Sequence, residues 1–125
     1  MDQLKDVFTR VIGLTVTMQE SIEYLKANID QDKADELRIL SEDMISAVDT
    51  IGQALEPVVD ELADNKIKLY TVRLRSLLAR LHLAYSMANH SLVKETLKED
   101  LAPFFTTWCI ELNRVLSPYL DQKLM

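Results

Sequence analysis

Cysteine, glycine and proline are all scarce in this sequence. The 125 residues include one cysteine, two glycines and three prolines. The single cysteine, Cys109, cannot form a disulfide within the chain, which predicts a reducing, cytoplasmic setting. A β-rich or alternating β/α domain of this length needs many more turn residues. The shortage of glycine and proline therefore predicts an all-α domain.

Long apolar runs are also missing. Charged residues interrupt every apolar stretch well before the roughly 20 residues that a membrane-spanning helix needs. The first residues, Met-Asp-Gln-Leu-Lys-Asp, lack the basic start and apolar centre of a signal peptide. We therefore expect a soluble protein that binds no membrane.

Basic residues are too few for a nucleic-acid-binding protein of the usual kind. The net charge is −6, whereas affinity for phosphate backbones rests on clustered lysine and arginine. The charge is unevenly distributed, because residues 30–64 carry eleven acidic and two basic side chains, and residues 66–90 carry five basic side chains and no acidic one. We expect no nucleic-acid partner.

Apolar residues recur at spacings of three and four in four segments, the pattern of amphipathic helices. The predicted helices are 2–28, 32–63, 66–89 and 91–122. Turn-forming residues separate them, and at the third connection Asn89 suits a left-handed helix end and Ser91 suits the cap of the next helix. Three short connections favour antiparallel neighbours. The sequence thus predicts one domain over residues 1–125, an antiparallel up-down-up-down four-helix bundle; helical hairpins that dimerise are the alternative.

Two prolines fall inside the predicted helices. Pro57 lies in the second and Pro103 in the fourth, and each removes an amide donor and crowds the carbonyl four residues earlier. The apolar pattern continues past both prolines. We therefore expect proline-bent second and fourth helices rather than broken ones.

The residues that could carry chemistry form no recognised catalytic or metal-binding pattern. His82 and His90 have no glutamate three residues before them, which a di-iron bundle site requires. His90 and Lys94 resemble a phosphotransfer element only in spacing. The sequence predicts no catalytic residue, no metal and no cofactor.

The second predicted helix carries carboxylates, which are ligands that magnesium prefers. Its candidate ligands are Glu36, Glu42, Asp43 and Asp49. They flank inward-facing Leu and Met residues, which favours a solvated acidic face. A phosphotransfer-type or metal-dependent enzyme that uses a histidine or this acidic helix stays as the alternative function.

A basic stripe is the most distinctive feature outside the apolar pattern. Lys66, Arg73 and Arg80 share a seven-residue period and therefore one helix face. We expect this stripe to pair with the acidic second helix across the hairpin; exposed basic surface for an acidic partner is the alternative.

The fourth predicted helix carries more apolar residues than one seam needs. Phe104 and Phe105 are adjacent and cannot easily face one core, so one aromatic is expected at the surface. The candidate partner surface on this helix comprises Phe105, Ile110, Leu116 and Leu120. A broad helix buried on two sides is the alternative.

The short acidic helical chain is similar in general pattern to small bacterial bundle proteins such as flagellar export chaperones. Those proteins hold partner segments against helical faces, and no diagnostic motif links them to this sequence. The similarity and the surplus of helix-packing surface lead to one hypothesis. The chain is expected to be a non-enzymatic adaptor or chaperone-like module that binds a protein partner, or itself as a homodimer.

Overall fold

The computed structural model describes residues 2–120, and all regular structure in that range is helical. The predicted all-α class is confirmed. The first three long helices are α1 (Asp2–Ala27), α2 (Ala34–Leu55) and α3 (Ile67–Ser86), with a 3-10 turn η1 (Val59–Glu61) before α3. The fourth consists of α4 (His90–Glu95), the π-helical turn η2 (Thr96–Leu101) and α5 (Ala102–Leu120). Residues 121 and 122 of the fourth predicted helix lie outside the described residues.

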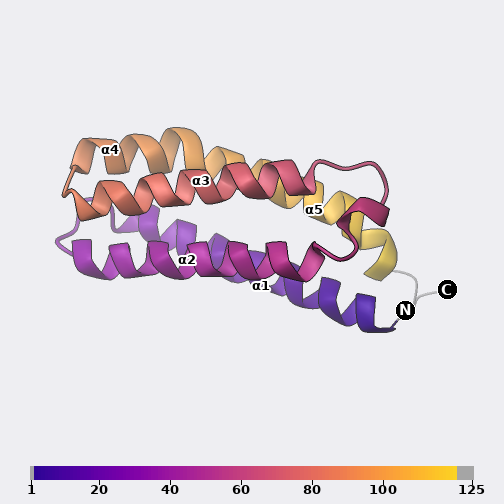
Figure 1. Cartoon of the computed structure of the whole chain (residues 1–125). Coiled ribbons are helices and arrows are strands. Elements are labelled where there is room, and N and C mark those ends of the chain that lie inside the picture. The colour runs from indigo at the N-terminus through magenta and orange to yellow at the C-terminus, as the bar shows by residue number, and fades with distance from the viewer. Residues whose placement is uncertain (1, 121–125) are drawn as a thin grey trace.

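The four helices lie alongside one another, and successive helices are joined at alternate ends (Figure 1). α2 packs against α1 and α3, and α5 packs against α1 and α3. The two chain termini lie at the same end of the molecule (Figure 1). Each helix therefore has two neighbours and one face toward the common interior.

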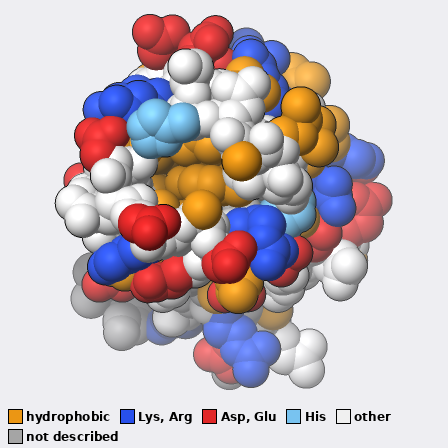
Figure 2. All heavy atoms as spheres, turned by 90° about the vertical axis from the view of Figure 1, so that its left-hand side faces the viewer, with side chains coloured by type: hydrophobic (Ala, Val, Ile, Leu, Met, Phe, Trp, Pro, Cys, Tyr) orange, Lys and Arg blue, Asp and Glu red, His pale blue; other side chains and the backbone are white. Residues whose placement is uncertain are grey.

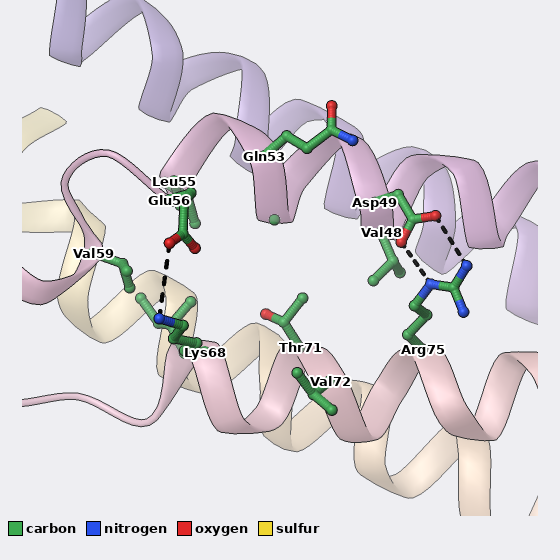
Figure 3. Close-up of a pocket in the computed structure, with 12 residues that line it drawn as sticks. Val48, Asp49, Gln53, Leu55, Glu56, Val59, Lys68, Thr71, Val72 and Arg75 are labelled. Atoms are coloured by element: carbon green, nitrogen blue, oxygen red, sulfur yellow. Dashed lines mark hydrogen bonds and ion pairs between the residues drawn. The ribbon is translucent and has the colours of Figure 1, made fainter.

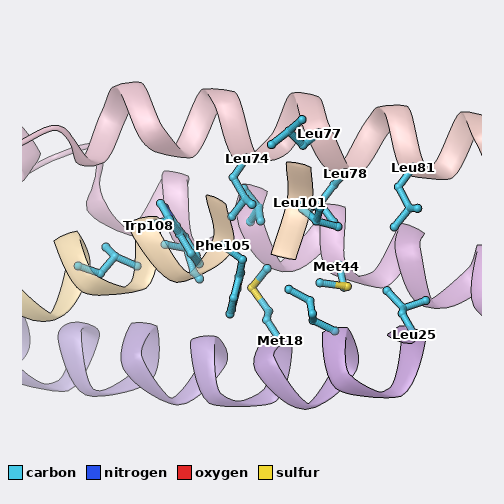
Figure 4. Close-up of a cluster of buried hydrophobic side chains, with 14 of the residues drawn as sticks. Met18, Leu25, Met44, Leu74, Leu77, Leu78, Leu81, Leu101, Phe105 and Trp108 are labelled. Atoms are coloured by element: carbon cyan, nitrogen blue, oxygen red, sulfur yellow. The ribbon is translucent and has the colours of Figure 1, made fainter. Parts of the chain in front are cut away.

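Apolar side chains from all four helices fill that interior (Figure 4). Met18 of α1, Met44 of α2, Leu74 of α3 and Trp108 of α5 are each at most 2% exposed. Trp108 packs beside Phe105, with ring centroids 5.7 Å apart. The core is thickest where these aromatic rings lie, because a buried aromatic side chain contributes more area than an aliphatic one.

The second helix ends earlier than predicted. α2 stops at Leu55, so Pro57 follows the helix instead of bending it. Pro57 cannot donate an amide hydrogen bond to the carbonyl of Gln53, and its ring crowds that carbonyl, so the α-helix does not continue past Glu56. The apolar pattern continues because Val59, in the turn η1, is buried against the core.

The fourth helix passes through a π-helical turn directly before Pro103. The amide of Ala102 donates to the carbonyl of Leu97, five residues earlier. Pro103 lacks an amide hydrogen, so the ordinary bond to the carbonyl of Glu99 cannot form. The wider turn lets the helix continue past the proline. A bend at Pro103 stays a prediction.

α3 ends in a Schellman motif built on an alanine. The amide of Ala88 donates to Tyr85 O and the amide of Asn89 donates to Ala84 O, both at 3.0 Å. Ala88, and not Asn89, adopts the left-handed conformation, with φ 54°. Asn89 instead caps α4, because its side chain accepts the amide of Leu92 at 3.1 Å. The predicted roles of Asn89 and Ser91 are therefore wrong.

Replacing Ala88 by glycine is expected to stabilise the domain by about 1 kcal/mol. Glycine adopts a positive φ without the steric cost that a Cβ atom imposes, and the Schellman position is where helices favour it. Urea unfolding would measure the difference. Ala79→Gly is the control, because Ala79 is an exposed residue in the middle of α3 and the same change there should cost about 1 kcal/mol. Equal destabilisation of both variants would contradict the prediction.

Candidate functional site

The predicted partner surface does not exist as one surface. Phe105 is 1% exposed and Leu116 is fully buried, whereas Ile110 is 64% exposed and Leu120 is half-buried. α5 packs against both α1 and α3, so it buries a broad face that takes in residues beyond the main seam. The prediction is wrong for Phe105 and Leu116. Ile110 is an isolated exposed side chain.

Of the two adjacent phenylalanines, Phe104 lies nearer the surface and Phe105 is buried. Phe104 is half-buried and makes an edge-to-face contact with Tyr70, with ring centroids 5.4 Å apart. The guanidinium of Arg73 lies over the other side of this ring, 5.3 Å from its centroid. The ring therefore joins α5 to α3 at the surface.

The basic stripe faces the fourth helix rather than the acidic second helix. Besides the contact of Arg73 with Phe104, Arg80 forms an ion pair with Asp100 at 3.5 Å. The backbone amide of Lys66 donates to Glu111 at 2.7 Å. The predicted pairing with α2 is wrong for Arg73 and Arg80, because both side chains contact the fourth helix.

A different row of α3 residues pairs with the acidic helix. Lys68 lies 3.8 Å from Glu56, Arg75 lies 2.7 Å from Asp49, and His82 lies 3.6 Å from Glu42. We call these three pairs the charge ladder. Its members recur every seven residues on both helices in opposite directions, as antiparallel neighbours require. The seven-residue period that these acidic and basic residues share is the sequence signal for this pairing.

The best-defined pair of the ladder is that of Arg75 and Asp49. Arg75 Nε and Nη2 donate to the two carboxylate oxygens at 2.7 and 3.3 Å. These hydrogen bonds, together with the charge of Asp49, raise the pKa of Arg75 above its usual value. Both side chains are largely exposed, so the pair contributes to geometry more than to stability.

An exposed apolar strip runs along the outside of α3. Leu69 and Val72 are each 66% exposed, Leu83 is 55% and Met87 is 60% exposed. The outer strip, as we call it, comprises Leu69, Val72, Ser76, Ala79, Leu83 and Met87. Around the helix, the outer strip lies between the row of Lys68, Arg75 and His82 and the basic stripe. Its residues recur at spacings of three and four, but the buried residues of the same helix have this spacing too. The pattern alone therefore does not show which row is exposed.

A groove between α2 and α3 opens beside the outer strip (Figure 3). It has a volume of about 330 Å³. Two pairs of the charge ladder, Glu56 with Lys68 and Asp49 with Arg75, lie at its two ends (Figure 3). Val72 belongs both to the groove and to the outer strip. The groove and the strip thus form one continuous surface of the hairpin.

Both histidines are engaged by neighbouring side chains. His82 Nδ1 lies 3.2 Å from the hydroxyl of Ser41, in addition to its contact with Glu42. His90 lies 3.3 Å from Asp30, which also binds Lys94 at 2.9 Å. The hydrogen bond from Lys94, followed by that from His90, holds the pKa of Asp30 below its usual value. The serine beside His82 is buried, and its hydroxyl donates to the carbonyl of Arg38 at 2.6 Å.

Burial changes the protonation equilibria of Cys109 and Tyr85. Burial raises the pKa of Cys109 to about 11, so the thiol stays protonated at neutral pH and is a poor nucleophile. Burial likewise raises the pKa of Tyr85 to about 12. Between residues 2 and 120, no group of three or more His, Cys, Asp or Glu side chains could hold a metal ion. Glu36 accepts the hydroxyl of Tyr24, Glu42 lies near Arg38 and His82, and Asp49 accepts from Arg75.

The end of the molecule formed by the α1–α2 and α3–α4 connections is hollowed. Figure 2 shows hydrophobic side chains at the bottom of this hollow, surrounded by charged and polar residues. The hollow has a volume of about 140 Å³, and Ile29, Leu37 and Val93 contribute to its lining. Tyr85 also lines this hollow, and its hydroxyl is buried and has no hydrogen-bond partner among the described residues.

The described part of the chain is therefore a small all-helical domain in which α3 carries an exposed apolar strip beside a groove. Residues 6–111 match the family described as a domain of unknown function, DUF8042, and the chain belongs to this family. No curated protein and no solved structure matches the chain. None of the helices between residues 2 and 120 is both long enough and apolar enough to cross a membrane.

Proposed function

We propose that this chain is a non-enzymatic protein-interaction module, an antiparallel up-down-up-down four-helix bundle that binds a helix of a protein partner along α3. The observation that carries the proposal is the outer strip. Its four large apolar side chains are all more than half exposed. They are spaced to meet the apolar face of one apposed helix over about five turns.

The charges around the outer strip indicate an acidic partner. α3 carries Lys68, Arg73, Arg75 and Arg80 but no acidic residue. Lys68, Arg75 and Arg80 are already paired with Glu56, Asp49 and Asp100. Arg73 lies over the Phe104 ring and forms no ion pair with the described acidic residues, so its charge remains available to a partner. An amphipathic helix with acidic side chains flanking its apolar face therefore complements this surface.

The same charges disfavour a second copy of the chain as the partner. The strip is nearly symmetric about its small residues Ser76 and Ala79, so an antiparallel pairing of two α3 helices would match Val72 with Leu83. That register would also bring Arg73 of one copy close to Arg80 of the other. Repulsion between like charges opposes this pairing. A cytoplasmic location, from the single cysteine, stays part of the proposal.

The test compares one double variant on α3 with one single variant on α5, at residues that are all more than half exposed. Leu69→Glu combined with Leu83→Glu should weaken partner binding by at least about 100-fold, because two large apolar contacts are lost and two like charges are added. Ile110→Glu, on α5, should change binding by less than about twofold. The partner would be purified with the tagged protein from its host and its affinity measured by calorimetry at two salt concentrations.

The outcomes of this test separate the possible partners. Loss of binding in the α3 variant alone, together with weaker wild-type binding at high salt, would support the proposal. Equal loss in both variants, or no loss in either, would contradict it. Light scattering distinguishes a homodimer, since a dimer that the α3 variant dissociates would identify a second copy in place of an acidic partner.

A further inference from the structure

The groove between α2 and α3 exists because Gly52 faces it without a side chain. Gly52 lies on α2 opposite Thr71 of α3, and both line the groove. A Cβ atom built on Gly52 would lie 3.7 Å from Thr71 Cγ2, an ordinary van der Waals contact. A side chain at this position is therefore sterically possible and would occupy space that is now open.

The walls of the groove are apolar. Its apolar lining comprises Val48, Leu55, Val59, Ile67 and Val72. Most of these side chains are also part of the buried core, so the groove is a continuation of the interior toward the surface. An occupant gains by removing apolar surface from water, as ligands of concave apolar sites do.

The charged residues at the ends of the groove do not select a charged occupant. Arg75 is held by two hydrogen bonds to Asp49, and Lys68 lies opposite Glu56. Each end thus carries one positive and one negative side chain. A charged ligand would gain attraction from one member of each pair, meet repulsion from the other, and lose part of its hydration.

Thr71 supplies the one hydroxyl in the groove. Its oxygen accepts the indole N–H of Trp108 at 3.0 Å, so the hydroxyl hydrogen remains as a donor. No acceptor between residues 2 and 120 takes that hydrogen. Figure 3 shows the Thr71 side chain in the middle of the groove, between the two charged pairs. An occupant with an oxygen acceptor near its centre or end would complete this hydrogen bond.

From these features we infer that the groove is a binding site for a small uncharged molecule with an unbranched apolar body and one acceptor oxygen, such as a medium-chain ketone, aldehyde or ester. A methylene group and a water molecule each occupy roughly 30 Å³. The groove volume of about 330 Å³ therefore fits a molecule of roughly ten non-hydrogen atoms. The site adjoins the outer strip through Val72, but its other lining residues lie outside the strip.

Three probes of equal chain length test the inferred chemistry. Octan-2-one, octanoate and octylammonium would each be titrated into the full-length protein, with amide chemical shifts followed by NMR. Octan-2-one should shift the amides of Gly52, Thr71 and Val72 saturably, with a Kd of about 1 mM or lower. Octanoate and octylammonium should bind at least about fivefold more weakly, because each carries a full charge.

Two matched leucine variants test the site. Gly52→Leu fills the groove and should weaken octan-2-one binding at least about tenfold. Gly13→Leu is the control, since Gly13 is an exposed glycine within α1 and nothing lies within 4 Å of a Cβ atom built on it; its binding should match the wild type. If Gly52→Leu fails to fold, Gly52→Ala, which leaves less room without a clash, should still weaken binding measurably.

Several results would overturn the inference. One is the absence of a saturable shift with octan-2-one up to its solubility limit. Another is equal affinity for all three probes, which would mean that charge is not selected against. A third is unchanged binding in a folded Gly52 variant, which would place the probe elsewhere. None of these results would affect the proposal for the outer strip, because that proposal is tested with different residues.

Discussion

Replacing Phe105 by lysine is expected to abolish the cooperative folding of this domain. Phe105 is 1% exposed and packs against Trp108 in the centre of the core. The substitution removes a buried ring, at about 3–5 kcal/mol, and introduces an ammonium group without a buried partner, at several more. The total is comparable with the whole stability of a domain of this size, about 5–15 kcal/mol.

The measurement is urea unfolding followed by circular dichroism at 222 nm. Ile110→Lys provides the control on the same helix, because Ile110 is 64% exposed; its free energy of unfolding should stay within about 0.5 kcal/mol of the wild type. A cooperative transition in Phe105→Lys with normal helical signal would show that Phe105 can leave the core. That result would restore the partner surface predicted from the sequence.

Trp108 carries the second large effect. Trp108→Ala should lower the free energy of unfolding by about 3–5 kcal/mol, because Trp108 is fully buried and its loss leaves a cavity among α1, α3 and α5. Trp108→Phe should cost less, since it keeps most of the apolar volume and loses chiefly the hydrogen bond to Thr71. Removing that bond is expected to cost about 1–3 kcal/mol.

A double-mutant cycle separates the hydrogen bond from the packing. Thr71→Val leaves the indole N–H of Trp108 without its acceptor, and Trp108→Phe removes the donor. If the bond at 3.0 Å couples the two residues, the double variant should be less destabilised than the sum of the single variants. Strict additivity would show that the two side chains contribute independently.

The class of the fold was predictable, because each helix needs only a repeating apolar pattern that the sequence displays directly. The ends of the helices were harder to predict from the sequence. Val58 and Leu62 continue the pattern of the second helix beyond Pro57, but in the structure they flank the 3-10 turn η1 and pack partly buried against the core outside any α-helix. The alanine at the left-handed end of α3 gave no sequence signal, since alanine has no preference for that conformation.

The candidate site was harder to predict for a different reason. A spacing of three and four identifies the faces of a helix but does not say how many neighbours cover each face. α5 meets two helices and buries Phe105 and Leu116, whereas the outer face of α3 meets none of the described residues closely enough to bury Val72 or Leu83. The exposed surface is thus set by the arrangement of the helices, which no single helix encodes.

The charge ladder has a consequence for how the hairpin of α2 and α3 finds its alignment. Because its members repeat every seven residues on both helices, sliding α3 along α2 by one repeat would re-form two of the three pairs: the ladder tolerates errors of about 10 Å. Groups that do not repeat must therefore define the native alignment. Gly52, Thr71 and Trp108 meet in only one alignment of the helices. This contact therefore selects the native register among those that the repeating charges allow.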